Sequence, residues 1–146
     1  MKLVLIVEDE YGNAEVLQLL LEAAGFRVAS ASNGKVALEL LKGEAPALIL
    51  SDFMMPVMNG AELGDAVRRN PALAHIPFVF MSATDEAVVR SAFRGYDAFL
   101  AKPFEVDAMI ALVERLISSG RPAPPSSEEV GESMRQLLKG IHVRPG

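Results

Sequence analysis

The stretch Ala47-Leu-Ile-Leu-Ser-Asp52 decides how this chain folds. Four consecutive apolar residues are typical of a parallel strand that is buried on both faces, and this run ends in a hydroxyl and a carboxylate. The run Leu3-Val-Leu-Ile-Val7 has the same character and is followed by Glu8, Asp9 and Glu10. Two buried strands that both end in acidic residues predict an α/β protein with carboxylates gathered at one edge of a parallel sheet.

Strand and helix patterns alternate along the first 120 residues. Further strands are predicted at 26–31, 77–81 and 98–101, and helices at 13–24, 35–41, 61–69, 86–94 and 106–117. Five strands alternating with five helices imply right-handed crossovers and a doubly wound parallel sheet with helices on both faces. Ligands of such sheets bind beyond the carboxyl ends of the strands. The polar residues expected there are Glu8, Asp9, Asp52, Ser82 and Lys102.

Composition and charge argue against several classes of function. The 146 residues include no Cys, which removes disulfides, zinc–thiolate sites and Cys nucleophiles, and only two His. The net charge of -5 argues against direct DNA binding, because neutralising phosphates requires clustered Lys and Arg. No apolar run reaches the roughly 18 residues that a membrane span requires. We therefore expect a cytoplasmic protein that contacts neither DNA nor membrane.

Three carboxylates and an ammonium at one sheet edge predict a phosphoryl-transfer site. Singly, each has an ordinary explanation, since Glu8 and Asp9 could cap a helix and Lys102 could be a surface charge. Together, crowded carboxylates raise one another's pKa unless a cation lies among them, and oxygen ligands suit Mg²⁺. Asp52 could then be the nucleophile that forms an aspartyl phosphate, with Mg²⁺ and Lys102 offsetting the phosphoryl charge. The Ser82 hydroxyl could donate a hydrogen bond to that group.

Four motifs, each after a different predicted strand or at its end, resemble the receiver domains of two-component response regulators over about residues 1–119. They are Leu5-Ile-Val-Glu-Asp-Glu10, Asp52-Phe-Met-Met-Pro-Val-Met-Asn-Gly60, Met81-Ser-Ala83 and Phe99-Leu-Ala-Lys-Pro-Phe104. The resemblance implies a flavodoxin-like strand order of 2-1-3-4-5. It also implies a phosphorylation-dependent signalling switch, which is not an enzyme beyond promoting its own phosphorylation and dephosphorylation. The implied phosphodonor is a sensor histidine kinase or a phosphotransfer protein.

The resemblance further implies the ligands of a Mg²⁺ ion. Asp52 matches the phosphoacceptor, which also contacts the metal. Asp9 matches the direct Mg²⁺ ligand, and Glu8 matches the acidic partner that usually acts through water. The backbone carbonyl of Met54 matches a further ligand.

The switch residues implied by the resemblance are Ser82, Lys102 and Phe99. Ser82 and Lys102 match the hydroxyl and the lysine that contact the phosphoryl group, and the Lys102–Pro103 bond is expected to be cis. Phe99 matches the aromatic residue whose rotamer follows Ser82. The implied output surface is the fourth helix, fifth strand and fifth helix, roughly residues 86–119. It would contact an unknown downstream protein or a second copy of the chain.

Met54 stands two residues after Asp52, where many receivers carry a polar residue that positions the hydrolytic water. A thioether cannot take that role, so we expect a phosphorylated state that lives longer than average. The alternative is that Met54 only covers the pocket. Met54 also argues against a dehalogenase-type phosphatase, which needs a second acid at this position. Glu8-Asp9-Glu10 argues against a flavodoxin, because this segment would repel a flavin phosphate.

Residues 120–146 are predicted to follow the receiver domain of residues 1–119 as a Pro-rich linker at 120–126 and a short amphipathic helix and tail at 127–146. The apolar stripe of this helix is Val130, Met134, Leu137, Leu138 and Ile141. It could dock on its own domain, or bind a partner or a second copy. We expect a single-domain regulator, because the 26 residues from 121 to 146 are too few for a DNA-binding or catalytic domain.

Overall fold

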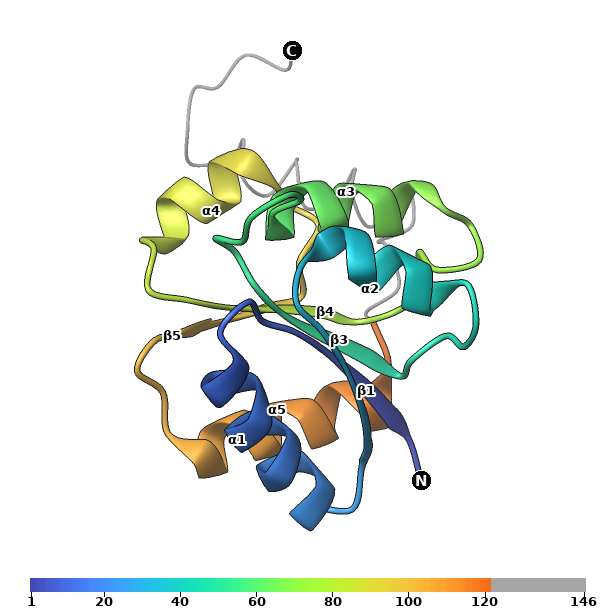
Figure 1. Ribbon diagram of the computed structural model, residues 1–146, viewed down its shortest axis with the longest axis vertical. Coiled ribbons are helices and arrows are strands. Elements are labelled where there is room, and N and C mark those ends of the chain that lie inside the picture. The colour runs from blue at the N-terminus through green and yellow to red at the C-terminus, as the bar shows by residue number, and fades with distance from the viewer. Residues whose placement is uncertain (122–146) are drawn as a thin grey trace, which may run out of the picture.

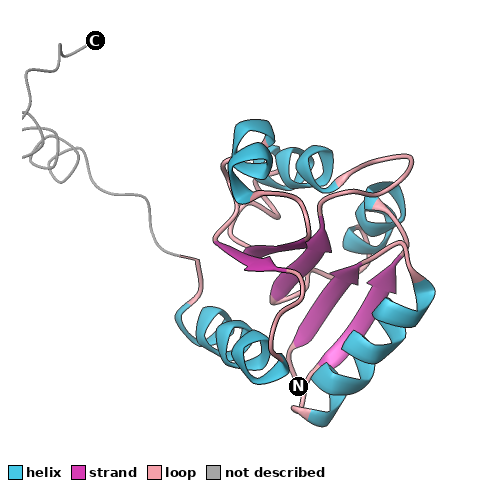
Figure 2. Ribbon diagram, turned by 90° about the vertical axis from the view of Figure 1, so that its left-hand side faces the viewer, coloured by secondary structure: helices cyan, strands magenta, loops and turns pink. Residues whose placement is uncertain are grey.

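The computed structural model describes residues 1–121, which form a five-stranded sheet with helices on both faces (Figures 1 and 2). All neighbouring strands are parallel, and their order is β2-β1-β3-β4-β5. This order confirms the predicted flavodoxin-like fold. The strands are β1 (Leu3–Val7), β2 (Arg27–Ala31), β3 (Leu48–Asp52), β4 (Phe78–Ser82) and β5 (Ala98–Ala101).

The helices cover the sheet in two layers, with α1 and α5 on one face and α2, α3 and α4 on the other (Figure 1). They are α1 (Tyr11–Ala23), α2 (Gly34–Leu41), α3 (Gly60–Arg69), α4 (Glu86–Ala92) and α5 (Val106–Ser119). Every strand and helix predicted within residues 1–121 is present, with bounds that differ from the prediction by two residues at most. The alternation of short apolar runs with helical spacing therefore predicted the architecture of this part of the chain correctly.

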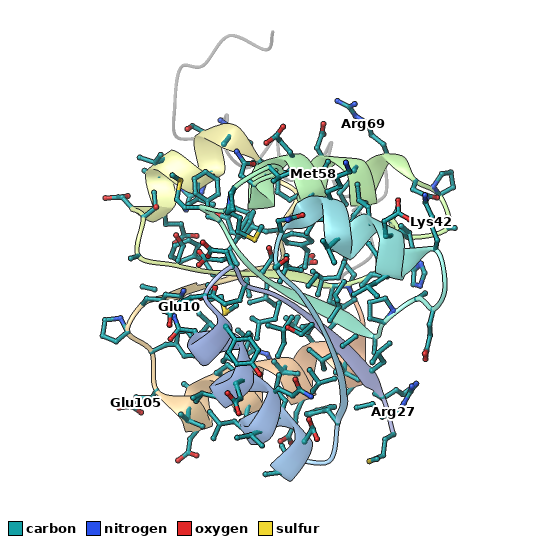
Figure 3. All side chains as sticks on the ribbon, in the orientation of Figure 1. Glu10, Arg27, Lys42, Met58, Arg69 and Glu105 are labelled. Carbon is teal, nitrogen blue, oxygen red and sulfur yellow. The ribbon has the colours of Figure 1, made fainter. Side chains whose placement is uncertain are left out.

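The sheet packs against each of its two helix layers through an apolar core. Side chains alternate along each strand, so neighbouring residues of the central strands enter different cores. Ile49 and Phe80 pack toward α3 and α4, whereas Leu50 and Met81 pack toward α1 and α5. All four are fully buried, which explains why the central strands are continuous apolar runs. The charged residues labelled in Figure 3 lie on the outside, namely Glu10, Arg27, Lys42, Arg69 and Glu105.

Local signals hold the loop after β3 in place. Asn59 and Glu62 form a reciprocal capping box at the start of α3, in which each side chain accepts a hydrogen bond from the other residue's backbone N–H. On its other side the loop is attached to α2, because Gly34 N donates to the Met58 carbonyl at 3.0 Å. These contacts fix the segment that leaves Asp52.

The predicted linker at 120–126 and the predicted helix at 127–146 lie almost wholly outside the described residues. Both interpretations of the apolar stripe concern that segment and remain predictions. Within residues 1–121, no helix has the length and apolar character that crossing a bilayer requires.

Candidate functional site

Three acidic residues meet at the carboxyl end of the sheet. Asp52 is the last residue of β3, and Glu8 and Asp9 directly follow β1, its neighbour in the sheet. One carboxylate oxygen from each residue lies within 4.8 Å of the other two. The parallel pairing of β1 with β3 therefore brings together carboxylates that are more than 40 residues apart, as the sequence predicts.

Lys102 completes this cluster from the end of β5, an edge strand of the sheet. It follows β5, and its backbone N–H donates to the Ser82 carbonyl at 2.9 Å. Its Nζ lies 3.0 Å from Asp52 Oδ2 and 3.5 Å from Glu8 Oε2. Burial alone would lower the pKa of Lys102, but the hydrogen bond and charge of Asp52, together with Glu8, raise it overall. These interactions keep the ammonium charged. The peptide bond between Lys102 and Pro103 is cis, as the sequence analysis expects.

Glu8 is the most buried member of the cluster, with only 3% of its surface exposed. Its Oε1 accepts a hydrogen bond from Asn13 Nδ2 at 3.1 Å, whereas its Oε2 has no hydrogen-bond partner among the described residues. Burial, followed by the adjacent carboxylate of Asp52, raises the pKa of Glu8 to about 7, although Asn13 and Lys102 act to lower it. The site holds more buried negative charge than one ammonium satisfies.

This arrangement fits a hard divalent cation. An unpartnered buried oxygen calls for a ligand, and the donor set consists of oxygen atoms alone. Mg²⁺ is typically held by one or two carboxylates together with water and phosphate oxygens, and at Asp9 the cluster is open to solvent. The residues that the sequence predicted as metal ligands through their side chains are therefore placed together and suit Mg²⁺.

The carboxylate of Asp52 is oriented by two donors. Its Oδ1 accepts the Phe53 backbone N–H at 2.7 Å, and its Oδ2 accepts Lys102 Nζ. The Asp52 side chain keeps 13% of its surface exposed, so the carboxylate can be reached from solvent. Met54, two residues further on, points outward with 63% of its surface exposed.

Ser82 and Phe99 lie on the adjacent strands β4 and β5. The Ser82 hydroxyl is buried and accepts the Thr84 backbone N–H at 3.0 Å. Phe99 is half-buried and pairs in register with Phe80. The ring of Phe99 lies 6.4 Å from the ring of Tyr96, measured between centroids. The two predicted switch residues are therefore neighbours on the sheet, on the side where α4 lies.

Sequence reasoning missed two polar residues, one in the acidic cluster and one beside α4. Asn13 donates to Glu8, and Tyr96 contacts both Phe99 and the first residue of α4. The position of Asn13, in the first turn of the helix that follows the acidic pair, was an available signal. Nothing in the local sequence around Tyr96 indicated its partners.

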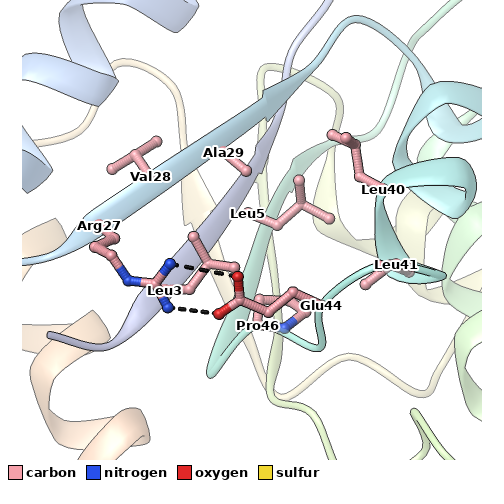
Figure 4. Close-up of a pocket in the computed structure, with 10 residues that line it drawn as sticks. Leu3, Leu5, Arg27, Val28, Ala29, Leu40, Leu41, Glu44 and Pro46 are labelled. Carbon is pink, nitrogen blue, oxygen red and sulfur yellow. Dashed lines mark hydrogen bonds and ion pairs between the residues drawn. The ribbon is translucent and has the colours of Figure 1, made fainter.

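A hollow of about 500 Å³ adjoins the acidic cluster. It lies between α1 and the segment after β5, and its lining is mostly apolar, with Asn13, Val16, Leu17, Met81, Ala83, Lys102, Pro103 and Phe104. A second hollow of similar size lies between β2 and the end of α2 (Figure 4). There Arg27 and Glu44 form a bidentate ion pair. The lining of this hollow includes none of Glu8, Asp9 and Asp52.

Comparisons with known proteins agree with this geometry. The family model of the response regulator receiver domain matches residues 4–114. The chain is 32% identical to the response regulator Rre1 of Synechocystis sp., over 97% of this chain and 68% of that protein. It is 33% identical to the alkaline phosphatase synthesis transcriptional regulatory protein PhoP of Bacillus subtilis, over 95% of this chain and 58% of that protein. The chain thus spans roughly three-fifths to two-thirds of these relatives.

Solved structures show the same likeness. The signal receiver domain of a signal transduction histidine kinase from Syntrophus aciditrophicus has a TM-score of 0.77 and 32% identity, covering 87% of this chain and 98% of that one. The response regulator protein TrrA of Thermotoga maritima, solved in complex with Mg²⁺–BeF, has a TM-score of 0.72 and 25% identity, covering 80% and 99%. This chain therefore belongs to the response regulator receiver domain family, the phosphorylation-based signalling switches of two-component systems.

Proposed function

We propose that this chain is a switch that accepts a phosphoryl group on Asp52 from the phosphohistidine of a sensor histidine kinase or a phosphotransfer protein. The observation that carries the proposal is the position of Asp52, which is accessible, lies 3.0 Å from Lys102 Nζ and has two further carboxylates beside it. A nucleophilic carboxylate next to a fixed cation is the arrangement that aspartyl-phosphate chemistry requires.

The transfer exchanges one bond to phosphorus for another. A carboxylate oxygen of Asp52 attacks the phosphorus, and an O–P bond forms while the N–P bond to the donor's imidazole breaks. The imidazole leaves with the electron pair of that bond, and Asp52 becomes an acyl phosphate. Lys102 already contacts Asp52 and offsets the charge on the phosphoryl oxygens, and Ser82 would donate its hydroxyl to the new group.

Glu8, Asp9, Asp52 and the backbone carbonyl of Met54 would hold a Mg²⁺ ion. Support comes from the unpartnered Glu8 oxygen and from the close approach of the three carboxylates. When bound, Mg²⁺ offsets negative charge on the phosphoryl group during transfer. Asp9 is the most exposed of the three acids and would be a direct ligand, whereas Glu8 would act through water.

The output of the switch would be a change in protein contacts. Movement of Ser82 toward the phosphoryl group would be followed by Phe99, and the surface of α4, β5 and α5 would then bind its target. The target would be a downstream protein or a second copy of this chain. We assign this work to a receiver domain at 1–119, followed by the linker and short helix predicted above. The net charge of -5 favours protein contacts over direct binding to DNA. In this proposal the contacts are made in the cytoplasm and not with a membrane.

The test is intact mass spectrometry after incubation with acetyl phosphate, with Mg²⁺ and with EDTA. The native chain should gain one phosphoryl group only with Mg²⁺, and Asp52→Asn should gain none. Asp65→Asn is the matched control, because Asp65 lies on α3 and pairs with Arg69 away from the cluster. No gain in the native chain and in a chain lacking residues 122–146, or an equal gain in Asp52→Asn, would overturn the proposal.

A further inference from the structure

We infer that Asn13 is a positioning residue of the acidic site, because its side-chain amide aims the Glu8 carboxylate so that one oxygen stays available to a cation. This inference rests on the proposed function, since it names a residue that prepares the same site. Asn13 is not among the residues that the receiver motifs assign, and it would not itself touch the phosphoryl group or the metal.

The geometry shows how Glu8 is held. Its backbone N–H donates to the Ala31 carbonyl at 3.0 Å, which attaches the residue to the end of β2. Its side chain is attached at Oε1, where Asn13 Nδ2 lies at 3.1 Å. The other oxygen, Oε2, lies 3.5 Å from Lys102 Nζ without a hydrogen bond. With backbone and Oε1 both fixed, Oε2 is directed toward the interior of the cluster.

An amide at this position suits a site that receives a cation. Asn13 donates a hydrogen bond without bringing a positive charge, so it satisfies one buried oxygen and leaves the negative charge of Glu8 available. A Lys or Arg there would compete with a metal ion for that charge. Glu8 is only 3% exposed, so its oxygens depend on donors within the protein. With an apolar residue at position 13, neither oxygen would have a side-chain donor among residues 1–121 other than the nearby Lys102.

The size of the effect follows from the behaviour of other metal sites. Removing a group that orients a metal-binding side chain typically lowers metal affinity by about 10- to 100-fold. Asn13 lies on the exposed side of α1 and lines the hollow beside the site, so water can replace part of its hydrogen bonding. We therefore expect the lower end of that range, about tenfold.

The experiment measures the Mg²⁺ dissociation constant by isothermal titration calorimetry, without phosphodonor. It compares the native chain with Asn13→Ala, with Asn13→Gln, which keeps the amide, and with Gln18→Ala, which removes an amide from the same helix away from Glu8. The expected dissociation constant rises about tenfold in Asn13→Ala, less in Asn13→Gln and not in Gln18→Ala. Thermal unfolding in EDTA shows that each variant is folded.

A second measurement separates positioning from a general loss of structure. The rate of phosphorylation by acetyl phosphate in Asn13→Ala should fall at low Mg²⁺ and return to the native rate at saturating Mg²⁺. A Mg²⁺ dissociation constant within twofold of native in Asn13→Ala, or an equal rise in Gln18→Ala, would overturn the inference while native phosphorylation still supported the proposed function. If the native chain binds Mg²⁺ but neither it nor a chain lacking residues 122–146 takes up a phosphoryl group, the proposed function is overturned. The calorimetric comparison would still decide the role of Asn13.

Discussion

The phenol of Tyr96 donates a 2.8 Å hydrogen bond to Oε2 of Glu86, which joins the segment before β5 to the first residue of α4. Arg90, one turn further along α4, donates from Nε to the same phenolic oxygen at 3.3 Å and pairs with Glu86. The Tyr96 ring rests edge-on against Phe80, with centroids 5.4 Å apart, and also contacts Phe99. Tyr96 thus connects α4 to the predicted switch residue of β5.

Replacing Tyr96 by Phe should loosen α4 while leaving the rest of the fold intact. The seven-residue helix buries only Val89, so its polar attachment to Tyr96 accounts for much of its anchoring. We expect amide hydrogen exchange of α4 to become several-fold faster, with a loss of about 1 kcal/mol in unfolding free energy. Tyr11→Phe is the control, because Tyr11 is 81% exposed. Unchanged exchange in α4 would show that the hydrogen bond does not hold the helix.

The stability of the metal-free protein should depend on pH through Glu8. Its pKa is raised in the folded state from 4.5 to about 7, mainly by burial. Between these values the folded state binds more protons than the unfolded state, so this contribution is complete below pH 4.5 and is lost as the pH rises through 7. In EDTA, the unfolding free energy of Glu8→Gln relative to that of the native chain should therefore rise by on the order of 2 kcal/mol from pH 5 to pH 8.

Urea unfolding at several pH values measures this difference. The comparison with Glu8→Gln removes the contributions of other titrating groups, which both proteins share. Asp9, Asp52, Lys102 and Asn13 surround Glu8 in both. A difference in unfolding free energy that stays constant from pH 5 to 8 would contradict the prediction. Adding Mg²⁺ at pH 8 should stabilise the native chain more than Glu8→Gln.

The side chain of Met54 should lengthen the lifetime of the phosphorylated state. Its thioether is at best a weak acceptor and cannot hold an attacking water firmly, whereas an amide at this position can. We expect the phosphoryl group of Met54→Asn to be lost severalfold faster than that of the native chain. Because the Met54 side chain is 63% exposed, the substitution should change stability little.

The measurement is the decay of phosphorylated protein after removal of the donor, followed by intact mass. Val57→Asn is the matched control, since it places the same amide three residues further along the loop, at a side chain that is 75% exposed. Slower decay in Met54→Asn than in the native chain would refute the prediction. Equal decay would favour the alternative that Met54 only covers the pocket.

Replacing Gly60 by Ala should both destabilise the protein and disturb Asp52. A Cβ at this position would overlap the Asp52 carbonyl oxygen and would lie 2.7 Å from Phe80 Cε1, so these atoms would have to move apart. We expect a loss of about 1–3 kcal/mol in urea unfolding and a slower phosphorylation by acetyl phosphate. Gly43→Ala is the control, because its Cβ would meet the Leu40 carbonyl at an ordinary 3.6 Å. Equal effects of the two substitutions would contradict this explanation.

Several features of this protein could be predicted from the sequence because they depend on local patterns. The continuous apolar run before Asp52 predicts a strand buried on both faces, and the end of each run places its polar residue at one edge of a parallel sheet. The cluster of Glu8, Asp9, Asp52 and Lys102 follows from that rule, and the structure confirms it. The doubly wound architecture required only periodicity and the fixed handedness of parallel connections, whereas the strand order was implied by the resemblance to receiver domains.

Other features were decided only by the tertiary structure. The hydrogen bonds from Asn13 to Glu8 and from Tyr96 to Glu86 depend on the exact direction in which α1 and α4 pack on the sheet. Val57 has a φ of 68°, a conformation that a β-branched side chain rarely adopts, and the loop between β3 and α3 imposes it. The sequence places Asn13 near Glu8, but the direction of these two hydrogen bonds arises only where separate elements meet. The sequence alone therefore determined the sheet and the carboxylates at its edge, while the packing of the helices determined which neutral side chains orient them.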